Sequence, residues 1–182
     1  MNSKDMNIVS VDSSLIEEVA RRTGDSIYNC YQCNKCSSGC PAAEFMDYPP
    51  AEIIRMVQFG LKDRILASRT IWVCSSCETC TTRCPNEVDI AMVMDIMREM
   101  CIKSGTQASD SNVLDLHRTF LSTIKRYGKL HELGLILGYK LKSKKYFDDI
   151  FLGLNMFRKG KIKLFPAKIK QIKEMRKILA RY

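Results

Sequence analysis

The chain has 182 residues, of which 46% are hydrophobic, and a formal net charge of +9. A chain of this size can bury one core, or a compact domain with a helical extension, and its composition excludes a disordered tail. It has no apolar run of about 18 residues, and residues 1–11 lack the charged-then-apolar order of a signal peptide, so we expect a cytoplasmic protein without membrane association.

The predicted elements are helices. Ser14 followed by Glu17 has the form of a capping box and predicts a first helix from Ser14 to about Gly24. Apolar residues at positions 90, 93, 94, 97 and 101 predict a helix over 89–103. Other helices are predicted over 51–59, 62–67, 110–127, 130–141, 146–157 and 167–180. Because no segment alternates like a strand with hairpin turns, the fold class is predicted to be all-α.

Charge divides the chain into two parts. Residues 1–117 contain 11 Lys and Arg against 16 Asp and Glu, whereas residues 118–182 contain 18 against 4. This shift follows the last cysteine, Cys101, and predicts a domain boundary near Arg118. We expect a metal-binding domain over residues 1–117 and a basic helical extension for partner docking over residues 118–182.

Eight of the nine cysteines form two identical blocks, 44 residues apart. The blocks are Cys30-x2-Cys33-x2-Cys36-x3-Cys40-Pro41 and Cys74-x2-Cys77-x2-Cys80-x3-Cys84-Pro85. This is the spacing of bacterial ferredoxins, in which a tight loop wraps three thiolates around three corners of one iron–sulfur cube. The sequence therefore predicts two [4Fe–4S] clusters.

The fourth cysteine of each block is expected to bind the other cluster. The proline after it favours an extended backbone that leads the chain away from its own loop, and two-cluster ferredoxins use this crossed pattern. The predicted ligands of the first cluster are Cys30, Cys33, Cys36 and Cys84, and those of the second are Cys74, Cys77, Cys80 and Cys40. Zinc is the structural alternative, but zinc needs two cysteine pairs and gives no reason for the third step or the duplicated Cys-Pro.

Other chemistry-bearing residues are weighed against plain structural roles. Lys35 and Arg83 lie inside the cysteine loops, where each would either offset cluster charge or be an ordinary solvated cation. Small or hydroxylated residues of the blocks, among them Ser37 and Thr81, are expected to approach the cluster sulfurs. Cys101 lies on the apolar stripe and is expected to be a buried structural thiol, and the core is also expected to contain Met92, Met94, Met97 and Met100.

Substrate chemistry is expected to lie on another subunit. The sequence has no dinucleotide fingerprint, no P-loop and no adjacent cysteine pair, and no catalytic constellation remains once eight cysteines bind clusters. No catalytic residue is therefore assigned.

The two blocks, joined by helices and with Trp72 just before the second, resemble the helical ferredoxin domain of fumarate reductase and glycolate oxidase iron–sulfur subunits. As a free-standing chain, the sequence most resembles the family of C subunits of heterodisulfide reductases from methanogenic archaea. The resemblance covers about residues 14–104, and the basic part is similar only in being helical.

This resemblance implies a non-catalytic electron-transfer subunit of an oxidoreductase in methanogenesis. In that family, the C subunit passes electrons from the A subunit, which bears flavin and iron–sulfur clusters, to the B subunit, which reduces the CoM-S-S-CoB heterodisulfide. The implied partners are these two subunits, and a hydrogenase or formate dehydrogenase fits in the same complex. The family's cluster ligands fall on the same eight cysteines.

Two alternatives stay open at this point. The first is the iron–sulfur subunit of a flavin-dependent hydroxyacid dehydrogenase such as glycolate oxidase. The second is a zinc module whose basic tail binds nucleic acid. Aromatic residues of the tail fall mostly at helical spacing, which favours core packing over base stacking, so we expect no nucleic-acid partner.

Overall fold

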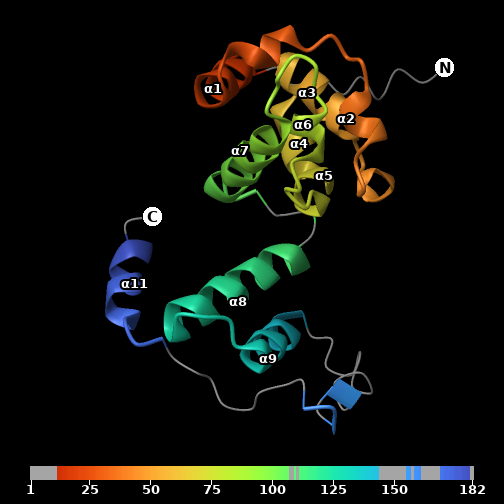
Figure 1. Ribbon diagram of the computed structural model, residues 1–182. Coiled ribbons are helices and arrows are strands. Elements are labelled where there is room, and N and C mark those ends of the chain that lie inside the picture. The colour runs from red at the N-terminus through yellow and green to blue at the C-terminus, as the bar shows by residue number, and fades with distance from the viewer. Residues whose placement is uncertain are drawn as a thin grey trace, which may run out of the picture. The chain divides into compact units, whose positions relative to one another are not determined.

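The computed structural model describes residues 12–106, 109, 111–143, 155–156, 158–160 and 169–180. The described residues form helices and no strand, as the sequence predicts. In chain order the elements are α1 (Ser14–Thr23), η1 (Asp25–Asn29), α2 (Lys35–Ser38), η2 (Ala43–Phe45), α3 (Pro50–Gln58), α4 (Lys62–Ala67), α5 (Thr70–Val73), α6 (Thr79–Thr82), α7 (Ile90–Lys103), α8 (Ser111–Tyr127), α9 (Glu132–Ser143) and α11 (Ile172–Leu179) (Figure 1). None of the helices described is both long and apolar enough to cross a bilayer.

The chain divides into two compact units, one ending at Asp110 and the other beginning at Ser111. The predicted boundary after residue 117 instead falls inside α8. The sign of the net charge changes midway along α8. The whole helix nevertheless belongs to the second unit, because α8 packs against α9 and α11. Packing, not charge, therefore defines the first unit as the residues up to 110.

The core of the first unit lies where α1, α3, α4 and α7 pack against one another (Figure 1). The stripe predicted on α7 is buried, since Ile90, Val93, Met94, Met97 and Cys101 are each at most 2% exposed. The prediction that Met92 packs in the core is wrong, because its side chain is 38% exposed. Met92 lies off the buried stripe, on the face of α7 that Asp95 also occupies.

The start of α1 differs from the predicted capping box. The residue before the helix is Ser13, which makes no side-chain cap. Instead, the Asp12 carboxylate accepts hydrogen bonds from the Ser14 amide at 3.0 Å and the Ser14 hydroxyl at 2.5 Å. The Asp12 amide also donates to the Gly60 carbonyl at 2.8 Å, so the same residue attaches α1 to the turn after α3.

Most of the other predicted helices have the expected positions. The segments predicted over 51–59, 62–67, 89–103, 110–127 and 130–141 appear as α3, α4, α7, α8 and α9, with ends within two residues of the prediction. The helix predicted over 146–157 lies largely outside the described residues. The helix predicted over 167–180 starts later than expected, because residues 169–171 are described and not helical and α11 spans Ile172–Leu179; residues 167 and 168 lie outside the described part.

The second unit is built around α8. The Tyr127 carbonyl accepts from the Ile169 amide at 3.2 Å, and the Lys125 carbonyl accepts from Arg176 Nε at 3.0 Å, so the segment leading to α11 lies on the end of α8. Several large apolar side chains of α8 and α9 are nevertheless 38–67% exposed. These are Leu116, Phe120, Leu121, Ile136, Leu137 and Leu141, called here the apolar face of the second unit.

Candidate metal centres

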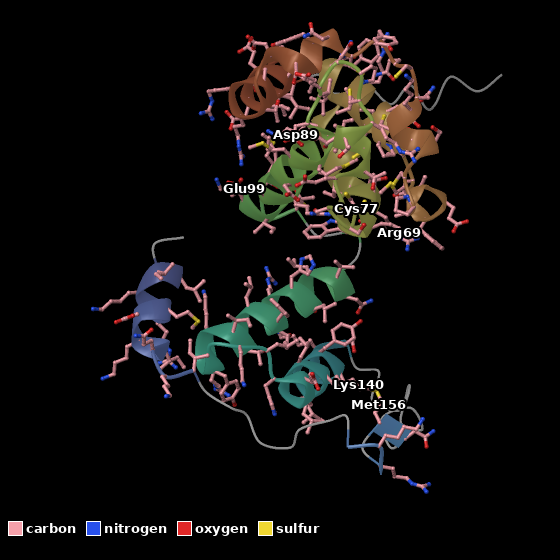
Figure 2. The ribbon with its side chains drawn as sticks, in the orientation of Figure 1. Arg69, Cys77, Asp89, Glu99, Lys140 and Met156 are labelled. Atoms are coloured by element: carbon pink, nitrogen blue, oxygen red, sulfur yellow. The ribbon has the colours of Figure 1, made fainter. Side chains whose placement is uncertain are left out.

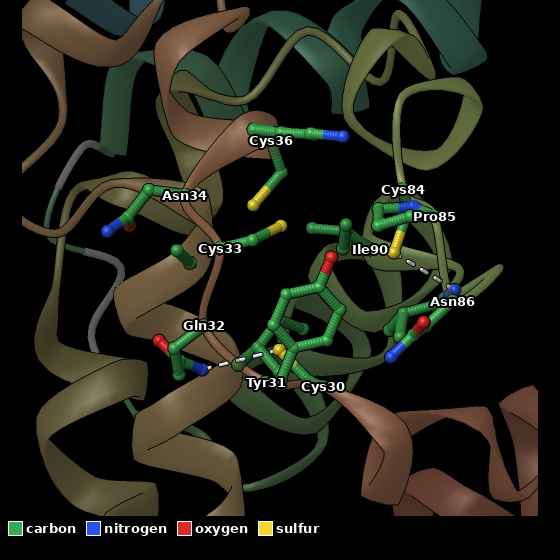
Figure 3. Close-up of a pocket in the computed structure, with 14 residues that line it drawn as sticks. Cys30, Tyr31, Gln32, Cys33, Asn34, Cys36, Cys84, Pro85, Asn86 and Ile90 are labelled. Atoms are coloured by element: carbon green, nitrogen blue, oxygen red, sulfur yellow. Dashed lines mark hydrogen bonds between the residues drawn. The ribbon is translucent and has the colours of Figure 1, made fainter.

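Two pockets in the first unit gather the eight cysteines of the blocks. The first pocket is lined by Cys30, Cys33, Cys36 and Cys84. Figure 3 shows these four side chains turned toward one common space. The second pocket is lined by Cys40, Cys74, Cys77 and Cys80. Each pocket thus takes three cysteines from one block and one from the other.

The cysteine loops share an unusual backbone. Gln32 and Asn34 in the first block, and Ser76 and Glu78 in the second, all have a positive φ between 49° and 61°. The two pairs are equivalent in the repeat, being 44 residues apart. A left-handed conformation costs a non-glycine residue about 1–3 kcal/mol, and it persists where the surroundings require it. Such turns point backbone N–H groups into a concavity that attracts anions. A cluster held by four thiolates is an anion, so both loops fit such a group.

A short helix follows each loop and carries the third cysteine. Cys36 lies on α2 and Cys80 on α6, and both are buried. These helices also hold the start of the next long helix through a hydroxyl. Ser37 Oγ accepts from the Ala51 amide of α3 at 3.0 Å, and Thr81 Oγ1 accepts from the Ala91 amide of α7 at 3.2 Å. The repeat therefore extends from the cysteines to the helices that cover them.

The start of α7 has an additional cap. Asp89, at the beginning of this helix in Figure 2, accepts from the Met92 amide at 2.9 Å and from the Thr81 hydroxyl at 3.2 Å. Thr81 therefore connects the second cysteine block to the cap of α7. Ser37 and Thr81 are predicted to approach the cluster sulfurs. Their hydroxyls hold helix ends, and they also bond to the thiols of Cys36 and Cys80, where they partly oppose the effect of burial on the pKa.

The two blocks are bound to each other near the fourth cysteines. Asn86, two residues after Cys84, donates its side-chain amide to the Asn29 carbonyl just before Cys30. The Val88 amide donates to Cys84 Sγ at 3.4 Å. These contacts hold Cys84 beside the loop of the other block, which is where the crossed pattern requires it.

Hydrogen bonds and burial differ among the thiols. The Gln32 side-chain amide donates to Cys30 Sγ at 3.3 Å (Figure 3). The Thr79 hydroxyl lies 3.3 Å from Cys77 Sγ. The bond with Thr79 lowers the pKa of Cys77. Burial has the opposite effect, raising the pKa of Cys36 and raising that of Cys80 to about 11. Iron must therefore displace protons from the buried thiols when it binds.

The exposed cysteines show where the pockets approach solvent. Cys33 and Cys77, the middle cysteines of the two loops, are both exposed. Of the two cations predicted inside the loops, Lys35 lines the first pocket and Arg83 packs against Gly39. Cys101 is fully buried, as predicted, with its Sγ 3.7 Å from the Leu66 carbonyl oxygen.

The donor sets fit clusters better than single ions. In the part of the chain that the structure describes, no three His, Cys, Asp or Glu side chains are grouped so as to hold one metal ion. A tetrahedral zinc draws its four ligands around one centre, whereas the ligands of a [4Fe–4S] cluster bind four separate irons and stand further apart. Two pockets of four thiols, with apolar walls and N–H-rich loops, match the requirements of a [4Fe–4S] cluster.

Sequence reasoning missed Gln58 and Arg98. The Gln58 side chain donates to the Ile27 carbonyl at 3.0 Å, and Arg98 donates to the Ile71 and Cys74 carbonyls. The repeat does relate these two residues, because Gln58 and Arg98 occupy equivalent positions of α3 and α7, 40 residues apart. The cysteines of the two blocks are instead 44 residues apart. Aligning the blocks on their cysteines alone hides this pair.

Comparison with known proteins agrees with this geometry. Residues 26–88 match the family described as a 4Fe-4S dicluster domain. The first unit therefore contains a 4Fe-4S dicluster domain, and its cofactors are two [4Fe–4S] clusters.

The chain is similar to the C subunits of heterodisulfide reductases. It is 35% identical over 99 residues, 54% of either chain, to the C subunit of the H(2):CoB-CoM heterodisulfide,ferredoxin reductase of Methanothermobacter marburgensis. It is 35% identical over 103 residues, 57% of this chain and 52% of the relative, to the iron-sulfur C subunit 2 of the CoB–CoM heterodisulfide reductase of Methanocaldococcus jannaschii. A Methanosarcina acetivorans relative, the C subunit of a ferredoxin:CoB-CoM heterodisulfide reductase, is 37% identical over 42% of this chain and 30% of its own length. The chain thus spans about half the length of the first two relatives.

Proposed function

We propose that the chain is the electron-relay subunit of a CoB–CoM heterodisulfide reductase. In this role it receives electrons from a flavin-bearing A subunit and passes them to the B subunit, which reduces the CoM-S-S-CoB heterodisulfide. The similarity to C subunits of these enzymes supports this assignment. The observation that carries it is the pair of pockets, each with four thiols, because one chain with two such centres and no assigned substrate site suits a relay.

The proposal includes crossed ligation. Cys30, Cys33, Cys36 and Cys84 bind the first cluster, and Cys74, Cys77, Cys80 and Cys40 bind the second. The distribution of cysteines between the two pockets supports this ligand set. Each bound cluster supplies a one-electron carrier. Crossed ligation ties the two centres into one folded unit, so neither loop can move independently of the other.

The protein's own residues protect and orient these centres. Ala51, Ile54 and Ile90 line the first pocket, and Pro50, Ala91 and Met94 line the second, so both have an apolar wall on the core side. Apolar walls exclude water, which preserves cluster sulfides and strengthens the effect of nearby charges on potential. The exposed edges at Cys33 and Cys77 leave each centre open to a partner.

Docking is assigned to the basic second unit. A relay must hold its clusters close to those of a donor and an acceptor, and a small domain offers little surface for two interfaces. The apolar face of the second unit supplies a further surface, on a unit that is rich in Lys and Arg. Apolar contacts would contribute affinity, while the cations steer the unit toward an acidic partner. The proposal also includes a cytoplasmic location.

The test is anaerobic purification of the tagged chain from its native source, followed by identification of co-purifying proteins. We expect a flavoprotein and a protein with adjacent-cysteine motifs, and reduction of CoM-S-S-CoB by the purified complex. Recovery of a hydroxyacid dehydrogenase flavoprotein instead would favour the alternative of an iron–sulfur subunit of that class. A chain that is fully loaded with clusters but recovered alone would contradict both.

A further inference from the structure

The two cluster sites are halves of an internal repeat, and one of their differences lies in the side chain that reaches back from the covering helix. In the first half Ser37 holds the Ala51 amide of α3, and in the second half Thr81 holds the Ala91 amide of α7. Seven residues beyond each alanine lie Gln58 and Arg98. Both side chains reach back to equivalent carbonyls, since Gln58 Nε2 donates to Ile27 and Arg98 Nε donates to Ile71. A neutral amide in one half thus has the place of a cation in the other.

Arg98 makes more contacts with its loop than Gln58 makes with the first. Its Nη2 donates to the Cys74 carbonyl, and its Nη1 donates to the Ser76 hydroxyl at 2.8 Å. Ser76 is one of the left-handed residues of the second loop. Among the described residues, Gln58 has no corresponding bond to Cys30 or Gln32. The guanidinium therefore bonds the second loop at Cys74 and Ser76 and α5 at Ile71, which the planar fork of an arginine can do and a glutamine cannot.

The charge of Arg98 is only partly compensated. Its Nη1 lies 2.5 Å from Asp95 Oδ1, but the Arg98 side chain is 15% exposed and that of Asp95 is 59% exposed. Water screens the exposed carboxylate more than the largely buried guanidinium. Lys35 lines the first pocket and Glu78 the second, and both are exposed, so their charges are screened as well. Arg98 does not line the second pocket itself, but its largely buried guanidinium bonds directly to Cys74 and Ser76, which do.

We propose that Arg98 is a positioning residue of the second cluster and raises its reduction potential above the value that a neutral residue, such as the glutamine of the first half, would give. Reduction adds negative charge to a cluster, which a nearby cation stabilises, and net charge and hydrogen bonds are established determinants of cluster potential. This difference between Gln58 and Arg98 contributes to making the two clusters unequal. This inference rests on the proposed ligand set.

The experiment is Arg98→Gln, which installs the residue that the other half already uses. A glutamine there can still donate to the Ile71 carbonyl, as Gln58 does to Ile27, so the fold and both clusters should be retained. Anaerobic redox titration followed by electron paramagnetic resonance measures the two clusters separately, with Cys74→Ser and Cys30→Ser identifying the signals. We expect the equilibrium constant for one-electron reduction of the second cluster to fall about tenfold, or about 59 mV, with the first unchanged.

Two further variants keep the test decisive. Arg21→Gln removes a cation whose side chain is 70% exposed and should shift neither potential. Arg98→Lys keeps the charge but not the planar fork. The equilibrium constant for one-electron reduction of its second cluster should stay within about threefold of the wild-type value. This variant provides the test if Arg98→Gln loses the second cluster. Unchanged potentials in Arg98→Gln, a shift of the first cluster alone, or an Arg98→Lys shift as large as that of Arg98→Gln would overturn the proposal.

Failure of the proposed function gives different results. If Cys74→Ser and Cys30→Ser remove the same signal, the ligand set is wrong. If the wild-type chain joins no reductase complex, the relay assignment is wrong, although the potential shift can still be measured on the isolated chain.

Discussion

The Arg83 side chain packs against the backbone of Gly39, which occupies the equivalent position in the other half of the repeat, 44 residues earlier. A Cβ on Gly39 would lie 2.7 Å from Arg83 Cδ. Gly39 directly precedes Cys40, and Arg83 directly precedes Cys84. The contact therefore joins the two chain segments that deliver the crossed cysteines, and the missing side chain of glycine allows this close approach.

The first prediction is that Gly39→Ala weakens this junction. Gly39 has a φ of −98°, which alanine adopts freely, so the effect comes from the contact alone. Because an arginine side chain can partly move away, we expect a cost of about 1 kcal/mol, at the low end for overpacking. The measurement is the temperature of cluster loss under anaerobic conditions. In an Arg83→Ala background the same substitution should cost almost nothing, and an equal cost in both backgrounds would contradict the prediction.

The second prediction concerns metal content. The anaerobically purified chain should contain about eight irons and eight inorganic sulfides, because two complete ligand sets each hold one [4Fe–4S] cluster. Chelation of the iron should unfold the first unit, since cluster binding and folding are coupled. Metal and sulfide analysis with circular dichroism measures both. One or two zincs per chain without sulfide would contradict it.

The third prediction follows from crossed ligation. Cys40→Ser should damage the cluster bound by Cys74 and its loop, and leave the cluster of its own block largely intact; Cys84→Ser should do the reverse. Electron paramagnetic resonance that resolves the clusters provides the measurement. If Cys40→Ser removes the signal that Cys30→Ser also removes, ligation is local.

Cys101→Ser is the matched control for these variants. Cys101 is fully buried on α7 and lines neither pocket, so the serine variant should keep about eight irons. Burying a hydroxyl in place of the thiol should still lower stability by about 1–3 kcal/mol. Loss of one cluster in this variant would show that Cys101 has a role in ligation.

The sequence allows accurate prediction where one physical factor dominates. The stripe on α7 follows from burial at helical spacing, and Pro50 at the first position of α3 follows from its fixed φ. The cysteines divide between the pockets as the ferredoxin spacing requires, although ligation itself remains a prediction. In each case a local pattern is enough.

Contacts between distant segments could not be predicted in this way. Asp12 caps α1 in place of the predicted Ser14, because its charged carboxylate is the stronger acceptor and its backbone is held by Gly60. Arg98 reaches the Cys74 carbonyl, 24 residues away, only after α7 has packed beside α5. These pairings depend on tertiary structure and have no short-range signal.

The fourth prediction compares two glycines with the same backbone. Gly60 and Gly105 have φ values of +66° and +68°, so alanine is strained at both, by about 1 kcal/mol. A Cβ at Gly60 would also lie 2.8 Å from the Asp12 carbonyl carbon, whereas a Cβ at Gly105 would have nothing within 4 Å. Gly60→Ala should therefore cost about 2 kcal/mol more than Gly105→Ala, because backbone must move. Thermal unfolding of the cluster-loaded variants measures the difference, and equal costs would show that the contact with Asp12 is unimportant.

The last prediction is that the apolar face of the second unit binds a partner protein. Leu121 and Leu137 are 51% and 61% exposed, so changing both to asparagine removes little buried surface and should leave the helices and both clusters intact. The double variant should recover at most about a tenth of the partner proteins that wild type recovers, as expected if the lost apolar burial is worth about 1.4 kcal/mol or more. Ser122→Asn, an exposed polar change on the same helix, is the control and should recover them normally. Truncation before residue 166 separately tests the basic helix α11, with iron content, assembly and liposome binding measured on each variant. Normal assembly by the double variant would refute docking of a partner protein on this face. A defect seen only in liposome binding would favour a membrane surface instead.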